Sequence, residues 1–180
     1  MTVIALLQLD PTVGDLAGNV ALVEAAVAKA AEAGADMAVT SELVISGYPP
    51  RDMLMDAKFV SECESMSMEV NSPIPLLIGT PLTADKERQK PFNGVVRVDH
   101  SRTSKIVGRK QLLPTYDVFD EGRYFQSDDG PGSIEACKVH PLASPFAKML
   151  GNTLARCPRI MPPTQSSNWL PGNIKVSHWP

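Results

Sequence analysis

Two charged residues stand at the ends of apolar runs, where a side chain can take part in chemistry. Glu42 closes the stretch 35–42 (ADMAVTSE), directly before a loop stiffened by a glycine and two adjacent prolines (GYPPRDM). Lys110 closes the stretch 104–110 (SKIVGRK). A carboxyl group held by a rigid loop beside apolar residues loses water easily, and such a group can act as a general base. A lone glutamate at a strand end is more often a solvated acid, so Glu42 needs support from its surroundings.

The segment around Lys110 is the second stretch of interest. A basic pair, Arg109 and Lys110, is followed by an apolar Leu-Leu-Pro run and then by the aromatic and acidic sequence TYDVFDEGRYF. Two interpretations are open from spacing alone. The segment is either part of a functional site or a surface loop whose aromatic residues cover the core.

The elements that position these residues alternate between strand and helix. Residues 2–9 predict a strand, because they are rich in Val, Ile and Leu and are followed by turn-forming residues. A helix is expected from an N-cap at Asn19 to a left-handed C-terminal residue at Gly34, because valine and alanine recur there at helical spacing. The further predictions are a strand at 35–42, a loop at 47–53, a helix at 57–70, a strand at 73–82 and a hairpin of strands 94–100 and 104–110.

This order of elements predicts an α/β fold whose sheet becomes mixed where the hairpin joins it. In layered α/β folds, functional residues gather just beyond the carboxyl ends of the strands. Glu42 and Lys110 both occupy such positions.

Four stretches resemble one known family. They are QLDPTVGDLAGN (8–19), SELVISGYPPRDML (41–54), FNGVV (92–96) and RKQLLPTYDVFDEGRYF (109–125). They are similar to the glutaminase domain of glutamine-dependent NAD⁺ synthetases, a branch of the nitrilase or carbon-nitrogen hydrolase superfamily. The likeness extends from about Val3 to Phe125, and GYPPRDML and LPTYDVFDEGRYF are specific to that branch.

The resemblance implies a partial nitrilase-type α-β-β-α sandwich and a Glu-Lys-Cys triad. It assigns the general base to Glu42, the lysine that stabilises the transition state to Lys110, and a contact with the substrate L-glutamine to Tyr116. Amide hydrolysis by this route needs three chemical groups. They are a thiolate that forms a thioester, a base that activates the thiol and later a water, and a cation beside the oxyanion. The released ammonia would pass to a synthetase domain or subunit of the same enzyme.

The cysteine of this triad is not identifiable. In the family it opens a C-E-D-x-W stretch well downstream of the lysine. Cys63 lies upstream in a predicted helix and is interpreted as a buried core residue, while Cys137 and Cys157 are followed by KVHP and PRIM. Without a thiolate, almost no turnover is expected from this chain.

The expected place of the nucleophile is near Phe146 and Ala147, and one hypothesis is that the chain is translated out of frame from about Pro145. A reading frame offset by two bases across 145–151 can encode V-C-E-D-A-W in order. Residues 172–177 (GNIKVS) would restore the original frame, since they resemble a strand of the family. The alternative is a genuine divergent segment.

Composition divides the chain at the same region. All 20 acidic residues lie within 1–135, whereas residues 136–180 contain five basic residues and no acid. We therefore interpret 1–135 as the N-terminal part of a nitrilase-like glutaminase domain and 136–180 as an aberrant or divergent segment, truncating the domain. A shifted frame ignores the selection that places acids on surfaces, which favours the hypothesis.

The overall composition limits the kinds of partner that the protein is expected to bind. The net charge is −3 and no basic run occurs, so no nucleic-acid partner is expected. The apolar start is too short for a membrane span, and the cysteine pattern favours a cytoplasmic setting. No cofactor is expected for this domain; ATP and Mg²⁺ would belong to a synthetase domain, whose S-G-G-x-D-S loop is absent from the sequence. The family resemblance implies a homo-oligomer.

Three functional interpretations remain. The first is the glutamine amidohydrolase, and the second is a catalytically inactive remnant. The third is a pseudoenzyme that binds related subunits. Within the enzyme class, another carbon-nitrogen hydrolase of the same superfamily is the alternative.

Overall fold

A seven-stranded mixed sheet is the centre of the computed structural model, which describes residues 2–85, 89–101, 103–115, 120–129, 167–170 and 174–179. The strand order is β5-β4-β3-β2-β1-β7-β6. The strands are β1 (Thr2–Leu7), β2 (Met37–Thr40), β3 (Leu76–Leu82), β4 (Phe92–Val98), β5 (Ser104–Arg109), β6 (Ser167–Leu170) and β7 (Ile174–Trp179). The helices are α1 (Leu16–Glu32), α2 (Ala57–Glu69), α3 (Glu121–Tyr124) and the 3₁₀ helix η1 (Arg51–Met55).

The pairing of the strands confirms the predicted mixed sheet. Strands β1, β2 and β3 are parallel neighbours, joined by the crossover helices α1 and α2, whereas β3, β4 and β5 are antiparallel. The helix and strand order of the N-terminal part therefore agrees with the α/β fold expected from the sequence. The predicted loop at 47–53 needs one correction, because η1 begins within it at Arg51.

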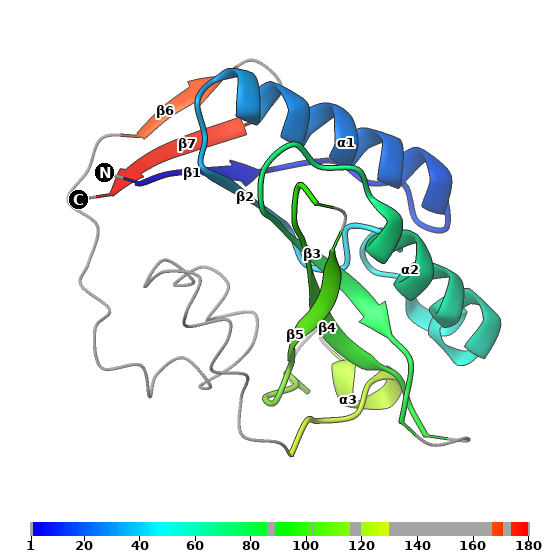
Figure 1. Ribbon diagram of the computed structural model, residues 1–180. Helices are drawn as coiled ribbons and strands as arrows, with labels where there is room; N and C mark the ends of the chain where they lie inside the picture. The colour runs from blue at the N-terminus through cyan, green and yellow to red at the C-terminus, as the bar shows by residue number, and fades with distance from the viewer. Residues whose placement is uncertain are drawn as a thin grey trace.

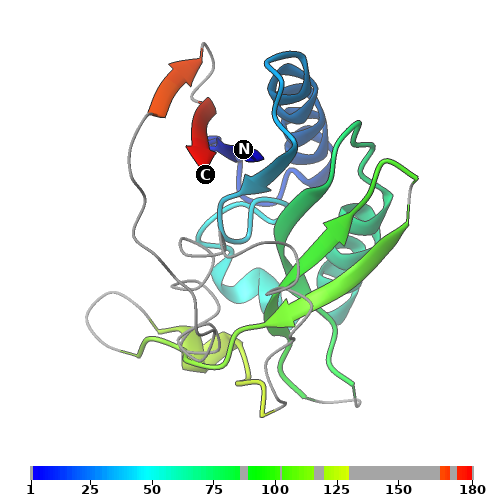
Figure 2. The same ribbon diagram turned by 60° about the vertical axis from the view of Figure 1, so that its left-hand side comes forward.

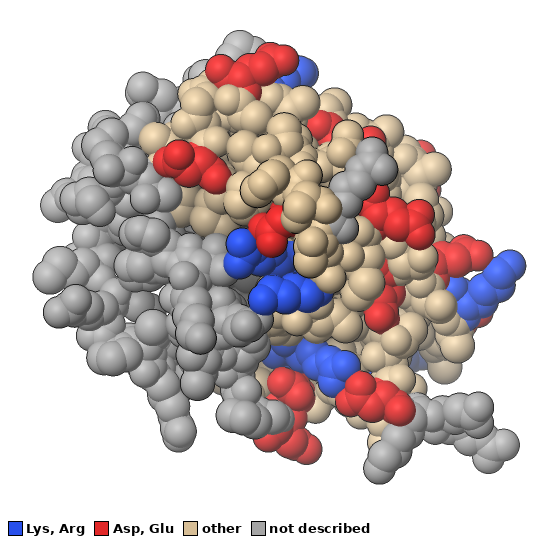
Figure 3. Space-filling model, in the orientation of Figure 1, with Lys and Arg blue, Asp and Glu red and all other residues tan. Residues whose placement is uncertain are grey.

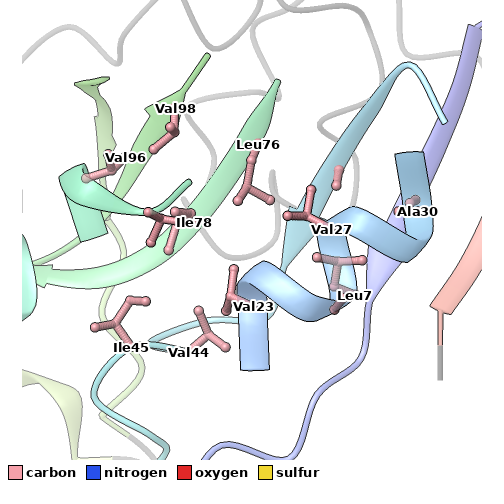
Figure 4. Close-up of a cluster of buried hydrophobic side chains, with 14 of the residues drawn as sticks. Leu7, Val23, Val27, Ala30, Val44, Ile45, Leu76, Ile78, Val96 and Val98 are labelled. Atoms are coloured by element: carbon pink, nitrogen blue, oxygen red, sulfur yellow. The ribbon is translucent and has the colours of Figure 1, made fainter. Parts of the chain in front are cut away.

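One face of the sheet carries both long helices, as Figures 1 and 2 show from two directions. Side chains from α1, including Val23 and Val27, pack with Leu7, Ile78 and other residues of this face (Figure 4). Alternate strand residues form a second cluster that contains no helix residue: Ile4, Met37, Leu77, Val95 and Val107. Because neighbouring residues of a strand point to opposite faces, this second cluster belongs to the other face of the sheet. The described residues thus form one helix layer and one sheet layer.

The beginning of α1 differs from its prediction. Asp15, rather than Asn19, is the N-cap, and its Oδ1 accepts a hydrogen bond from the backbone N–H of Gly18 at 2.9 Å. Asn19 is buried and exchanges hydrogen bonds with the backbone of Thr12 and Ile45. Asparagine and aspartate are both favoured at N-caps, so the residue types alone do not choose between Asp15 and Asn19. The side chain of Asn19 is occupied by its contacts with Thr12 and Ile45, which leaves Asp15 as the cap. The left-handed residue at the end of the helix is confirmed, because Gly34 has φ of +82°.

The C-terminal strand returns to the N-terminal one. β7 pairs antiparallel with β1, from Thr2 opposite Trp179 to Leu7 opposite Ile174, so both ends of the chain lie close together (Figure 1). The prediction of a strand within 172–177 is confirmed for the residues from Ile174 onward. The stretch 145–151, on which the frame hypothesis depends, lies outside the described residues, as does the boundary proposed between 135 and 136.

Candidate active site

Glu42 lies two residues beyond the end of β2, in a turn that crosses β3. The turn is tight, because Leu43 has a positive φ of 53°. Thr40 fixes its start, since its Oγ1 accepts a hydrogen bond from the N–H of Gly79 at 3.1 Å. The turn leaves the Glu42 side chain 26% exposed. A rigid turn with partial exposure suits a carboxylate that must reach a substrate.

Lys110 follows the last residue of β5, and its side chain reaches the turn after β2 that carries Glu42. Its backbone N–H donates to the carbonyl oxygen of Asn93 on β4 at 2.7 Å. Its Nζ lies 2.8 Å from Oε1 of Glu42 and 2.9 Å from Oε1 of Glu121, and the residue is only 5% exposed. The structure therefore brings together the two residues singled out in the sequence, which are 68 positions apart.

Two further residues join this cluster, and neither was singled out from the sequence. Glu121, the first residue of α3, is 8% exposed and pairs with Lys110. Asn93 is 1% exposed, and its Nδ2 donates to Oε1 of Glu42 at 2.5 Å. The only available signals were the FNGVV and FDEGRYF stretches of the family resemblance, in which nothing separates these residues from their neighbours.

The charges of the cluster are unbalanced, with two carboxylates beside one ammonium. Burial alone lowers the pKa of Lys110, but the adjacent Glu42 and Glu121 outweigh it, and the pKa lies above its ordinary value. Burial raises the pKa of Glu121, and this effect with the charge of Glu42 exceeds the opposing effect of Lys110. Burial and then Glu42 and Glu121 also raise the pKa of Tyr48. Lys110 therefore stays cationic, while the pKa of Glu121 lies above its ordinary value.

A pocket of about 400 Å³ opens beside the cluster. Its apolar wall includes Leu43, Leu54 and Phe125, and Tyr48 and Glu121 bring polar atoms to it. The lining residues come from the loop after Glu42 and from the segment 120–125, which are the two stretches most specific to the family resemblance. The pocket can hold a small molecule that carries both apolar and polar groups.

Several residues of the sequence prediction remain untested. Tyr116, Cys137, Phe146, Ala147 and Cys157 lie outside the described residues. Cys63 is described: it is fully buried in α2, as expected, and burial raises its pKa to about 12. Cys63 is inaccessible and does not line the pocket described above, so it does not fit the role of the nucleophile.

Other kinds of site find no support in the described part of the chain. No group of three or more His, Cys, Asp or Glu side chains there is arranged to hold a metal ion. No helix among the described residues is long and apolar enough to cross a membrane. On the face shown in Figure 3, positive and negative side chains of the described residues lie beside one another.

Known proteins are similar to this chain over most of its length. The sequence profile of the family described as carbon-nitrogen hydrolase matches residues 3–154, a range that continues past residue 135. A glutamine-dependent NAD(+) synthetase of Synechocystis is 38% identical over 135 residues, which are 71% of this chain and 24% of that protein. Its counterpart from Thermotoga maritima is 33% identical, over 68% of this chain and 21% of that protein. The chain thus spans about a quarter of the length of these relatives.

Solved structures show the same likeness. A glutamine-dependent NAD+ synthetase from Acinetobacter baumannii matches 72% of this chain and 24% of its own, with 27% identity and a TM-score of 0.59. A mutant form of a Nesterenkonia amidase from the nitrilase superfamily matches 72% of this chain and 49% of its own, with 23% identity and a TM-score of 0.59. The second match concerns the fold alone.

Proposed function

The chain belongs to the carbon-nitrogen hydrolase family, and we propose that it is part of the glutamine-hydrolysing domain of a glutamine-dependent NAD⁺ synthetase. The observation that carries the proposal is the contact of 2.8 Å between Nζ of Lys110 and Oε1 of Glu42, in a cluster beside a pocket. The names of the curated relatives supply the substrate, L-glutamine, and the acceptor of its ammonia, a synthetase domain.

The chemistry follows from the residue types. In a chain that carries the family's nucleophile, Glu42 takes the proton of the cysteine thiol, and the thiolate attacks the carboxamide carbon of glutamine. Lys110 stabilises the negative charge that develops on the carbonyl oxygen. The amide nitrogen of this intermediate receives the proton from Glu42 and leaves as ammonia, and a thioester remains. Glu42 then activates a water, which releases glutamate and the thiol.

The pocket is the proposed place of the glutamine chain. Its volume of about 400 Å³ accommodates an amino acid with space for water. Tyr48 lines it beside Glu121, so the phenol can donate to a polar group of the substrate. The family resemblance implies that Tyr116 also contacts the substrate. ATP and Mg²⁺ serve the synthetase reaction and take no part in this step.

The alternative is a protein that has kept this site without turnover. The observation in its favour is the sequence itself, because no cysteine in it opens a C-E-D-x-W stretch. Such a chain is either an inactive remnant or a pseudoenzyme that binds related cytoplasmic subunits in an oligomer. Both retain the pocket, but neither releases ammonia.

Glutamine binding and ammonia release separate these cases. We expect the full chain to bind L-glutamine in an NMR titration, and Tyr48→Phe to weaken binding several-fold. Lys58→Met is the matched control, because Lys58 is exposed on α2, away from the pocket. Ammonia release that is lost in Glu42→Gln and Lys110→Met supports the enzyme. Binding without release supports the inactive form, and the absence of saturable binding contradicts the proposed substrate.

A further inference from the structure

We propose that Asn93 is a positioning residue of this site, which holds Oε1 of Glu42 beside Lys110 and thereby leaves Oε2 as the oxygen that takes the proton. The inference rests on the proposed function, because it concerns the general base of that reaction. It assigns a role to a residue of β4 that contributes no atom to the bonds that form or break.

Asn93 holds both partners of the central ion pair. Its side-chain Nδ2 donates to Oε1 of Glu42, and its backbone carbonyl accepts the N–H of Lys110 at 2.7 Å. The position of Asn93 is itself fixed, since it pairs with Pro81 of β3 and lies next to Gly94, where an added Cβ would meet the Gly108 carbonyl oxygen at 2.9 Å. A single buried residue therefore sets the separation of Glu42 and Lys110.

The two oxygens of Glu42 are consequently not equivalent. Oε1 receives two hydrogen bonds, one from Asn93 and one from Lys110. Oε2 has no hydrogen-bond partner among the residues that the structure describes, and the side chain is 26% exposed. A proton on Oε1 would displace a donor, whereas a proton on Oε2 would not. The base therefore accepts its proton on Oε2.

The unpaired end of the amide supports a role directed at Glu42. Oδ1 of Asn93 is buried and has no hydrogen-bond partner within the described part of the chain. Leaving such an acceptor unpaired is unfavourable, so the opposite end of the amide must gain from its orientation. Turning the amide over would place Oδ1 against the carboxylate of Glu42 and repel it. The observed orientation thus directs the donor toward the negative charges of Glu42 and Glu121, and the Asn93 amide lowers the pKa of Glu121.

The type of this residue matters as much as its place. Asparagine supplies a donor without adding charge to a cluster that already holds Glu42, Glu121 and Lys110. An aspartate would add a third carboxylate, and a leucine of similar size would remove the donor. These two substitutions test the role without a large change in volume.

The test is a titration of the carboxyl groups by NMR on the full chain with ¹³C-labelled glutamate. Substitutions Glu42→Gln and Glu121→Gln assign the signals of the two carboxyl groups. In Asn93→Leu we expect the carboxyl chemical shift of Glu42 at neutral pH to change, because its Oε1 loses a donor. The apparent midpoint of Glu121 should rise, because the amide of Asn93 lowers the pKa of that group. Asn93→Asp is expected to raise the midpoint of Glu121 further and serves if the leucine variant does not fold.

The control is a second buried asparagine. Asn19 is 2% exposed, and its side chain hydrogen-bonds backbone groups of Thr12 and Ile45, so Asn19→Leu perturbs packing without removing a hydrogen bond from the cluster. A carboxyl chemical shift of Glu42 and a midpoint of Glu121 that both stay at their wild-type values in both Asn93 variants would overturn the proposal. So would neutron diffraction at acidic pH that found deuterium on Oε1 of Glu42 instead of Oε2.

This test is independent of turnover. The titration requires neither glutamine nor a nucleophile. A chain that shows the shift but binds no glutamine contradicts the proposed function and leaves Asn93 as the residue that orders the cluster. A chain that binds glutamine but shows no shift contradicts the role of Asn93 alone.

Discussion

The backbone of Glu42 lies directly on Gly79 of the neighbouring strand. A Cβ atom at position 79 would be 3.0 Å from Cα of Glu42 and 2.6 Å from the carbonyl oxygen of Ser41, and both contacts are with backbone. Backbone cannot rotate away as the end of a side chain can. Only glycine therefore allows the turn that carries the proposed base to cross β3 where it does.

Gly79→Ala should consequently disturb both stability and the site. We expect a loss of about 1–3 kcal/mol in the free energy of unfolding, the usual effect of overpacking, and a loss of glutamine binding as Glu42 moves. Gly34→Ala is the control, because position 34 has a positive φ but no atom within 4 Å of an added Cβ. It should cost about 1 kcal/mol and leave binding unchanged. Urea unfolding and NMR titration of both variants measure these effects; equal effects on binding would refute the argument.

Removing the lysine should expose the charge imbalance of the cluster. In Lys110→Met, Glu42 and Glu121 face each other without a cation, and we expect a loss of about 3–5 kcal/mol near pH 7. The loss should shrink in acid, because the pKa of Glu121 is already raised and Lys110 no longer lowers it. Urea unfolding between pH 4 and pH 8 checks this, with Lys58→Met as the control. A loss that does not depend on pH would contradict it.

Lys110 also sets an upper pH limit for the stability of the folded protein. Its pKa is raised in the folded protein above the ordinary 10.5, so the unfolded chain loses the proton first. The stabilisation is complete below that value and is lost as the pH rises through the folded pKa. We expect the unfolding midpoint of the wild-type chain to fall more steeply above that pH than that of Lys110→Met. Parallel curves for the two proteins would argue against it.

Patterns within the sequence could predict those parts of the fold that depend on near neighbours. Apolar runs and helical spacing located β1 to β5, α1 and α2, and Gly34 was identified from its place after a helical period. Glu42 and Lys110 were found because each ends an apolar run. Asn93 and Glu121 were missed because their importance comes from contacts with Glu42 and Lys110, 51 and 11 positions away. The predicted N-cap at Asn19 was wrong for the same reason, because this side chain contacts Ile45, 26 positions away.

Cys63 should be inert in the folded protein. It is fully buried, and its pKa of about 12 leaves almost no thiolate at about pH 8. We expect iodoacetamide to leave the peptide of Cys63 unmodified in native protein and to modify it fully in urea, as measured by mass spectrometry. Rapid modification without urea would show that the thiol is accessible and would reopen the question of its role.

Sequencing of the coding DNA tests the hypothesis that the nucleophilic cysteine is missing because the reading frame is shifted. Across codons 140–175 we expect an offset frame to read VCEDAW and then an acid-containing amphipathic helix, because a shifted frame accounts for the missing acids and the missing cysteine together. The chain translated from the corrected frame should release ammonia from glutamine, and Glu42→Gln or Lys110→Met should abolish that release. Lys58→Met should leave it intact. If no frame encodes this stretch, residues 136–180 are a divergent segment, and the shared cluster of Glu42, Lys110 and Glu121 then serves binding without turnover.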